Sequence, residues 1–286
     1  MSLHPLGALS SAPRRVPLLL RACHLEPAVA VTVLVTALAV TAGRGVAGSA
    51  AVAAAVLTGQ LSVGWCNDAA DGRRDTACGR RDKPVATGEL PPWAAAAAAG
   101  TALALCVPLS LLSGATAGAV HVAGVAAGWA YNLVLKRTAL SPIPYAVGFG
   151  SLPAFVTLGL RPSVWPAWWA LAAGALLGLA AHVVNVLPDI DDDLASGVRG
   201  LPQRLGPPAC RVLAPLVTLA ALGLLIAGPP GAAGPADWVL GAAAAAVTAS
   251  GTALPTASGS RWPFRAAIIG STIAVSLLLL RGADMA

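Results

Sequence analysis

Oxygen-bearing side chains recur at four-residue intervals in one stretch of the sequence. Asn67, Asp71 and Asp75 occupy positions i, i+4 and i+8 directly after an apolar run. On a helix this spacing places the three side chains in one stripe, where the two carboxylates repel one another unless a cation lies between them. Ligands made only of oxygen favour Mg²⁺, which proteins commonly bind through one or two carboxylates together with substrate phosphates. The stretch therefore predicts a magnesium site that accepts a phosphorylated substrate.

A second acidic stretch repeats this spacing with Asp189 and Asp193, and nine of the twelve acidic residues lie in the two segments 68–89 and 189–193. An isolated acidic run is usually a solvated surface, and the second stretch lacks the glycine and the terminal glutamate of a calcium-binding EF-hand loop. Two runs with the same spacing are better explained by a pair of sites that hold Mg²⁺ against a diphosphate. The predicted metal ligands are Asn67, Asp68, Asp71, Asp75, Asp189 and Asp193.

Basic side chains accompany both acidic stretches. Arginine offers a planar fork that grips two phosphate oxygens, whereas lysine is a point charge. Such side chains can bind the phosphate oxygens that a metal leaves free. The candidates are Arg73, Arg74, Lys83, Lys136, Arg137, Arg199 and Arg204.

The composition indicates a membrane protein in which these side chains must be positioned. Of 286 residues, 57% are hydrophobic and 10% are charged, and the mean hydropathy is +0.75. A soluble domain devotes about a quarter of its residues to charge, and disordered chains are poor in apolar side chains. The net charge of +6 is explained by membrane topology, so no nucleic-acid partner is predicted. The five cysteines show no C-x-x-C spacing, which argues against a zinc site or a disulfide framework.

Apolar runs predict an all-α polytopic bundle of about nine transmembrane helices, with eight or ten crossings also open because Pro153 interrupts the fifth run. The runs lie near 27–43, 46–65, 92–113, 115–135, 145–160, 164–187, 207–228, 235–254 and 264–281. With nine crossings and a cytoplasmic N-terminus, fifteen of the eighteen Lys and Arg residues fall on the cytoplasmic side, as the positive-inside rule requires.

This topology predicts a cytoplasmic N-terminal tail, residues 1–26, rather than a signal peptide. Residues 27–286 form a single transmembrane domain, arranged as one helix followed by two four-helix halves. The acidic stretches lie in cytoplasmic loops near 66–91 and 186–206, each after the corresponding helix of its half. A pseudo-repeat of this kind brings the two loops face to face.

The motifs resemble those of a known family. The N-D-x-x-D-x-x-x-D pattern of 67–75, the R-D-K-P-V-A-T-G-E-L of 81–90 and the segment 189–206 are similar to the signature loops of the UbiA superfamily of intramembrane prenyltransferases. The resemblance implies a nine-helix bundle and magnesium dependence. It also implies transfer of a prenyl group from a polyprenyl diphosphate to an aromatic or other lipid-soluble acceptor.

The resemblance also implies roles for individual residues. The aspartates bind the donor diphosphate through Mg²⁺, and Asp68 lies off their stripe, where it can orient a basic neighbour. The implied catalytic residues are Asp71, Asp189, Lys136, Tyr131 and Arg204. The residues implied to bind the diphosphate are Lys83, Arg137, Arg199 and Asn132.

Two positions depart from the family pattern. Lys136 follows Tyr131 by five residues, where many members have four, and Asn132 is placed to share the role of Tyr131. Gly200 stands where relatives often carry threonine. Aromatic side chains that could line a prenyl channel and shelter a carbocation are Trp65, Trp129, Tyr131, Tyr145 and Phe149.

Two other functions are alternatives to prenyl transfer. The same metal site serves a membrane terpene cyclase, which uses no acceptor. A secondary transporter is less favoured, because transporters place charged groups near the bilayer midplane. Two lysines against sixteen arginines indicate a GC-rich bacterial genome and hence a bacterial plasma membrane. The roles of His121, His182 and Glu26 stay open, as do the prenyl chain length, the acceptor and the oligomeric state.

Overall fold

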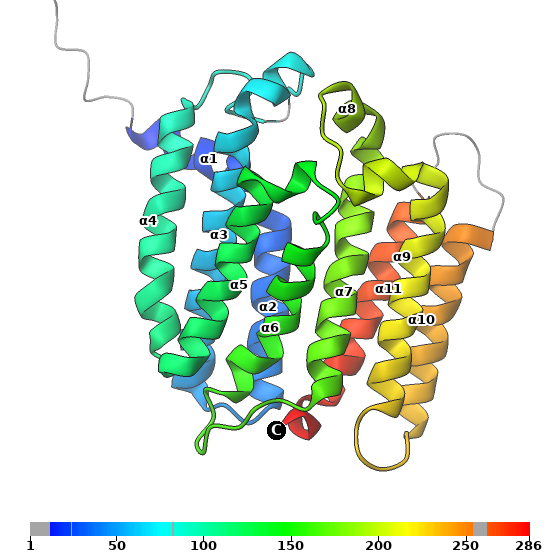
Figure 1. The fold of residues 1–286 in the computed structure, drawn as a ribbon. Helices are drawn as coiled ribbons and strands as arrows, with labels where there is room; N and C mark the ends of the chain where they lie inside the picture. Colours follow the sequence, from blue (N-terminus) through cyan, green and yellow to red (C-terminus); the bar gives the residue numbers. More distant parts are fainter. Residues whose placement is uncertain (1–11, 24, 82, 254–261) are drawn as a thin grey trace, which may run out of the picture.

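A computed structural model describes residues 12–23, 25–81, 83–253 and 262–286. In these residues the chain forms α-helices and short 3₁₀ turns without a β-strand, which confirms the all-α prediction. The longer helices stand side by side in one upright bundle (Figure 1). They are α2 (Leu25–Thr41), α3 (Val46–Ala77), α4 (Pro92–Leu111), α5 (Ala115–Leu133), α6 (Ile143–Thr157), α7 (Trp168–Val186), α9 (Leu201–Ala227), α10 (Pro235–Ala253) and α11 (Trp262–Leu280).

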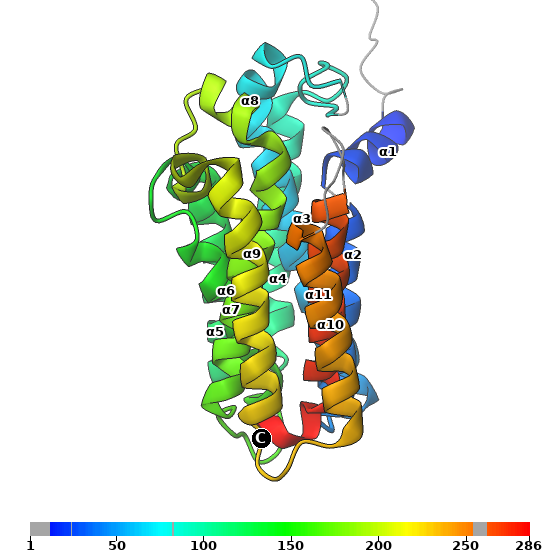
Figure 2. The same ribbon diagram turned by 90° about the vertical axis from the view of Figure 1, so that its right-hand side faces the viewer.

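Helices that follow one another in the chain are mostly packed together. The most extensive contacts join α3 with α4, α6 with α7, α7 with α9, and α10 with α11. The C-terminal end of α3 and the short helix α8 (Ile190–Ala195) lie at the same end of the bundle, opposite the C-terminus of the chain (Figures 1 and 2). The two acidic stretches therefore share one end of the molecule.

Each predicted apolar run overlaps one of these helices, but the number of membrane crossings stays a prediction. Within the described residues, four helices are long and apolar enough to cross a membrane: α3, α4, 168–195 and α9. A fifth is added if the bent pair 16–22 and 25–41 forms one span. Helix α6 has 15 residues, about 22 Å at 1.5 Å per residue, which is shorter than the roughly 30 Å hydrocarbon core.

Two helix boundaries differ most from the prediction, and each has a physical reason. Helix α3 extends to Ala77 rather than ending near residue 65, so much of the predicted 66–91 loop is helical. The carboxylates on this extension are paired with cations, which removes the repulsion that would otherwise unwind it. Helix α9 starts at Leu201 rather than at 207, and a kink at Gly206, with φ at 79°, precedes Pro207.

The core of the bundle fixes the helices that carry the site. Buried side chains from α3, α6, α7 and α9, such as Val52, Phe155, Trp169 and Leu225, form one apolar cluster. Helices α6 and α7 approach closely because Gly178 has no side chain: a Cβ there would lie 2.4 Å from the carbonyl oxygen of Tyr145. This contact brings the aromatic side chains of α6 beside α7.

The predicted N-terminal tail includes helix α1 (Ala12–Ala22), which packs on the segment after α3. Leu19 lies against the apolar cluster of Val85 and Leu90, and its carbonyl oxygen accepts a hydrogen bond from the Trp65 indole at 2.8 Å. Arg21 pairs with Glu89 at 3.4 Å. Helix α1 thereby holds the 83–90 segment against the bundle.

Candidate active site

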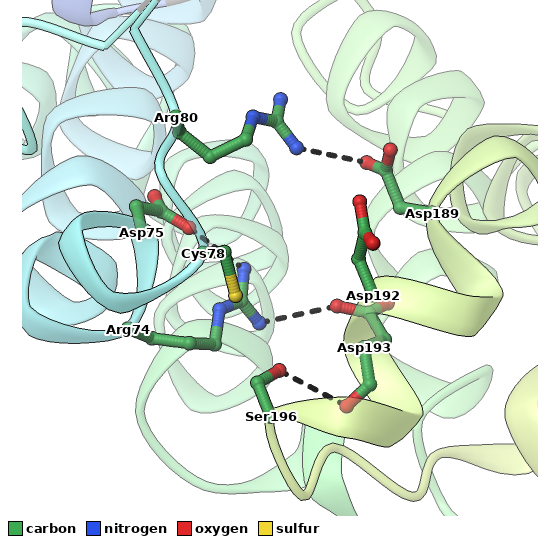
Figure 3. A pocket seen from close by; sticks show the side chains of 8 residues that line it. All are labelled: Arg74, Asp75, Cys78, Arg80, Asp189, Asp192, Asp193 and Ser196. Atoms are coloured by element: carbon green, nitrogen blue, oxygen red, sulfur yellow. Dashed lines mark hydrogen bonds and ion pairs between the residues drawn. The ribbon is translucent and has the colours of Figure 1, made fainter.

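The two acidic stretches line opposite sides of one pocket at the end of the bundle (Figure 3). The end of α3 and the residues after it contribute Arg74, Asp75, Cys78 and Arg80. The α8 segment contributes Asp189, Asp192, Asp193 and Ser196. The structure thus brings together side chains that are more than a hundred positions apart in the sequence.

Arginines of the first stretch bridge the pocket to carboxylates of the second. One nitrogen of Arg74 lies 3.3 Å from Asp193, while the other lies 3.1 Å from Asp71 and 3.3 Å from Asp75. Arg80 pairs with Asp189 at 3.5 Å. Figure 3 shows both bridges crossing from the α3 side to the α8 side.

Asp71 lies at the centre of the predicted stripe and is 2% exposed. One of its oxygens accepts a hydrogen bond from the ammonium group of Lys136, and the other lies 3.3 Å from the amide nitrogen of Asn67. The same amide donates to the Asn132 side chain at 3.1 Å. The structure therefore places Lys136 and Asn132 directly beside the first acidic stretch.

Lys136 reaches Asp71 because a 3₁₀ turn follows α5. The residue lies on the 3₁₀ turn η1 (Leu135–Arg137) rather than on the α-helix, and it is 5% exposed. A 3₁₀ turn completes a revolution with three residues rather than 3.6, which changes the direction of the side chain. Burial lowers the pKa of Lys136 below its usual range, and the adjacent Asp71 carboxylate opposes that shift.

Asp75 and Asp68 share a second lysine. The ammonium group of Lys83 lies 2.7 Å from Asp75 and 3.9 Å from Asp68. Asp68 is buried off the stripe, and its carboxylate oxygens have no hydrogen-bond partner among the described residues. Its position beside Lys83 agrees with the predicted orienting role, while its assignment as a metal ligand stays a prediction.

The structure does not bring four of the predicted basic residues into this cluster. These exposed residues are Arg73, Arg137, Arg199 and Arg204. The Nε of Arg204 donates to the carbonyl oxygen of Arg199 at 2.8 Å, so the two residues contact one another rather than a carboxylate. Their assignments as diphosphate ligands stay predictions.

An aromatic cluster lies next to the paired charges. The ring of Tyr131 meets Tyr145 edge-on at 5.1 Å and His182 at 5.5 Å, and Tyr145 lies 4.7 Å from His182. Asn185 donates to the Tyr145 hydroxyl at 3.3 Å. Tyr131, Tyr145 and His182 therefore pack together where α5, α6 and α7 meet.

The two buried histidines have different surroundings. His182 lies 3.1 Å from the Ser141 hydroxyl, which also accepts the first backbone N–H of α9, from Leu201, at 3.0 Å. His121 instead lies 2.8 Å from Ser110 and stacks on Phe155 at 4.3 Å between ring centroids. His121 thus makes an interhelical contact, whereas His182 borders the aromatic cluster.

Sequence reasoning missed several residues of the site, including Arg80, which pairs with Asp189, and two uncharged side chains. Gln203 donates to Asp193 at 2.8 Å, but an uncharged amide beside a basic residue gives no signal of its own. Ser141 lies in a proline-rich connection, so nothing in the pattern indicates that it caps α9. This contact requires a glycine at position 200. A Cβ there would lie 2.8 Å from the Ser141 hydroxyl and 2.7 Å from the carbonyl oxygen of Lys136.

The donor set suits a magnesium ion that a substrate helps to hold. Among the described residues, no three His, Cys, Asp or Glu side chains cluster tightly enough to hold a metal unaided. The pocket nevertheless presents hard carboxylate oxygens from both sides, at Asp75, Asp189 and Asp193. Magnesium typically takes one or two carboxylates and completes its shell with water and phosphate oxygens. The residues therefore fit Mg²⁺ bound together with a diphosphate.

Comparison with known proteins places this geometry in a family. Residues 28–279 match the UbiA prenyltransferase family model. The bacteriochlorophyll synthase 33 kDa chain of Cereibacter sphaeroides is 30% identical over 189 residues, which are 60% of this chain and 59% of that protein. The chain thus spans about three fifths of the length of this curated relative.

Solved structures share the fold. A structure of digeranylgeranylglyceryl phosphate synthase matches with a TM-score of 0.69 and 16% identity, over 94% of this chain and 99% of the other. A UbiA homologue from Archaeoglobus fulgidus bound to GPP and Mg²⁺ matches with a TM-score of 0.67 and 14% identity, over 93% and 99%. The UbiA homologue from Aeropyrum pernix K1 matches with a TM-score of 0.66 and 21% identity, over 87% of this chain and 97% of the other. At these identities the likeness concerns the fold.

Proposed function

Because the chain belongs to the UbiA prenyltransferase family, we propose that it transfers a prenyl group from a polyprenyl diphosphate to an aromatic or other lipid-soluble acceptor, with Mg²⁺ as cofactor. The chain is a prenyltransferase and an integral membrane protein, as its family and its long apolar helices indicate. The observation that carries the proposal is the pairing of two aspartate stretches across one pocket, with cations between them.

In this proposal the pocket residues bind and stabilise the diphosphate. Asp71, Asp75, Asp189 and Asp193 would hold Mg²⁺, which supplies positive charge to the leaving diphosphate. Lys136 and the bridging arginines add charge that is already in place before the bond breaks, so little reorganisation is needed. These interactions lower the energy of the separating diphosphate and allyl cation.

The aromatic cluster would receive the prenyl end. The faces of Tyr131 and Tyr145 carry negative charge density that stabilises a cation. The packed side chains of α5, α6 and α7 would limit the access of water to it. The acceptor then attacks the allylic carbon, forms the new bond to carbon and loses a proton.

The test of this function is metal-dependent turnover. Purified enzyme is incubated with labelled geranylgeranyl or longer diphosphates and a panel of quinone precursors and lipid alcohols. We expect a prenylated acceptor, complete loss of product in EDTA, and recovery on adding Mg²⁺, because the aspartates repel a diphosphate unless a metal ion lies between them. Full activity in EDTA-washed enzyme would contradict the metal role. A labelled hydrocarbon formed without any acceptor would favour the cyclase alternative.

The only exposed one of the five cysteines offers a second test. Cys78 lines the pocket, while Cys23, Cys66, Cys106 and Cys210 are buried. Mg²⁺ with inorganic pyrophosphate at ten times its Kd should slow maleimide labelling of Cys78 about tenfold, because about a tenth of the sites stay empty. Mass spectrometry of the labelled peptide gives the rate, and Cys78→Ser is the control. Equal rates with and without both ligands would place the diphosphate elsewhere.

The same cysteine reports on orientation. We propose a bacterial plasma-membrane protein with a cytoplasmic N-terminus, so that the pocket faces the cytoplasm. A membrane-impermeant maleimide should then label Cys78 in inside-out vesicles and leave it unlabelled in intact cells. Labelling in intact cells would reverse the proposed orientation.

A further inference from the structure

Three carboxylates of the site share one pattern of hydrogen bonding. One oxygen of Asp71 is held by Lys136, one oxygen of Asp75 by Lys83, and one oxygen of Asp193 by Gln203. In each carboxylate the second oxygen contacts Arg74, at 3.1, 3.3 and 3.3 Å respectively. A single guanidinium therefore contacts the second oxygen of all three carboxylates, and the second oxygen of Asp71 also accepts a hydrogen bond from the Asn67 amide at 3.3 Å.

These contacts also join the two acidic stretches. Asp71 and Asp75 belong to α3, whereas Asp193 belongs to α8. Without a cation, the negative charges on the two sides would repel one another across the pocket. The Arg74 side chain is 20% exposed and lines the pocket, so it is held by carboxylates and yet open to a ligand.

We propose that Arg74 is a built-in counterion that holds the two aspartate stretches together before the substrate arrives and competes with the metal ion for their oxygens. This positioning role rests on the proposed function, because it concerns how the same site loads. A metal ion that binds the second oxygens must displace the guanidinium from them. The released guanidinium then faces the pocket and can pair with two phosphate oxygens, which suits its planar fork.

Competition fixes the sign of the expected effect. A side chain that occupies the oxygens before the metal binds lowers the apparent metal affinity by the fraction of molecules in which it leaves them free. If that fraction is about a tenth, Arg74→Gln should bind metal roughly tenfold more tightly than the wild type. A residue that served only to bind phosphate would leave metal affinity unchanged.

The experiment measures metal binding without turnover. Full-length enzyme in detergent is titrated with Mn²⁺, and free Mn²⁺ is followed by electron paramagnetic resonance, first alone and then with inorganic pyrophosphate. Arg211→Gln is the control for net charge, because Arg211 is exposed on α9. We expect tighter Mn²⁺ binding in Arg74→Gln and wild-type affinity in Arg211→Gln.

A second variant separates competition from a general charge effect. Arg74→Lys keeps the charge, but one ammonium group cannot reach all three carboxylates as the guanidinium does. We expect it to fold and to bind Mn²⁺ with an affinity between those of the wild type and Arg74→Gln.

The outcomes distinguish the counterion role from the proposed function. Equal affinity in Arg74→Lys and the wild type, or unchanged or weaker binding in Arg74→Gln, overturns the counterion role alone. If no variant binds Mn²⁺ even with pyrophosphate, both this role and the metal-dependent function are wrong.

Discussion

Replacing Asp71 with asparagine is expected to abolish prenyl transfer. Asp71 is 2% exposed and accepts contacts from Lys136, Arg74 and Asn67, so a predicted metal ligand also binds two of the site's cations. Asparagine keeps the shape of the side chain but removes its charge. Loss of a metal-binding carboxylate together with its ordering of Lys136 should lower kcat/KM by about a thousandfold or more.

The measurement compares release of labelled diphosphate by purified wild type and variant at equal amounts of extracted protein. Asp189→Asn should cause a similar loss, because it removes a carboxylate from the opposite side of the pocket. Asp191→Asn is the matched control: it lies in the same acidic run, is exposed, and should stay within about twofold of the wild type. Wild-type turnover by Asp71→Asn would show that the paired-aspartate site is not the reaction centre.

The aspartate stripe could be predicted from sequence because its geometry is local. Residues four apart on a helix share a face whatever surrounds the helix, and α3 does continue through Asp71 to Ala77. The predicted helix boundary near residue 65 is wrong because α3 continues beyond its apolar part to Ala77. In the structure, ion pairs with Arg74 and Lys83 support the polar extension.

The positions of the basic side chains depend on tertiary contacts, which leave no pattern in the sequence. Lys136 and Arg137 are adjacent in sequence, yet one is buried against Asp71 and the other is exposed. Charge and motif do not show which of the two side chains is buried. The 3₁₀ turn η1 decides it, and the sequence has no periodic pattern that predicts this turn. Arg204 likewise turns toward Arg199, while its neutral neighbour Gln203 contacts Asp193.

The bond between Lys136 and Asp71 should be the most stabilising ion pair of the site. Both side chains are almost fully buried, at 5% and 2% exposure, and removal of one partner leaves a buried charge. Such losses commonly cost 3–5 kcal/mol. Because Arg74 and Asn67 still contact Asp71, we expect Lys136→Met to lower the free energy of unfolding by about 3 kcal/mol, at the lower end of that range.

A double-mutant cycle tests whether the pair itself carries this cost. In the Lys136→Met background, Asp71→Asn removes the charge that was left buried, so it should destabilise less than it does alone. The expected coupling free energy is about 1–2 kcal/mol. It is measured by unfolding each protein in micelles of a mild detergent with a rising share of a denaturing detergent. The adjacent Arg137→Met, on an exposed side chain of the same turn, should change stability by less than about 0.5 kcal/mol. If the two site substitutions were simply additive, Lys136 would stabilise the fold through its packing, and its charge would be free to act on the diphosphate.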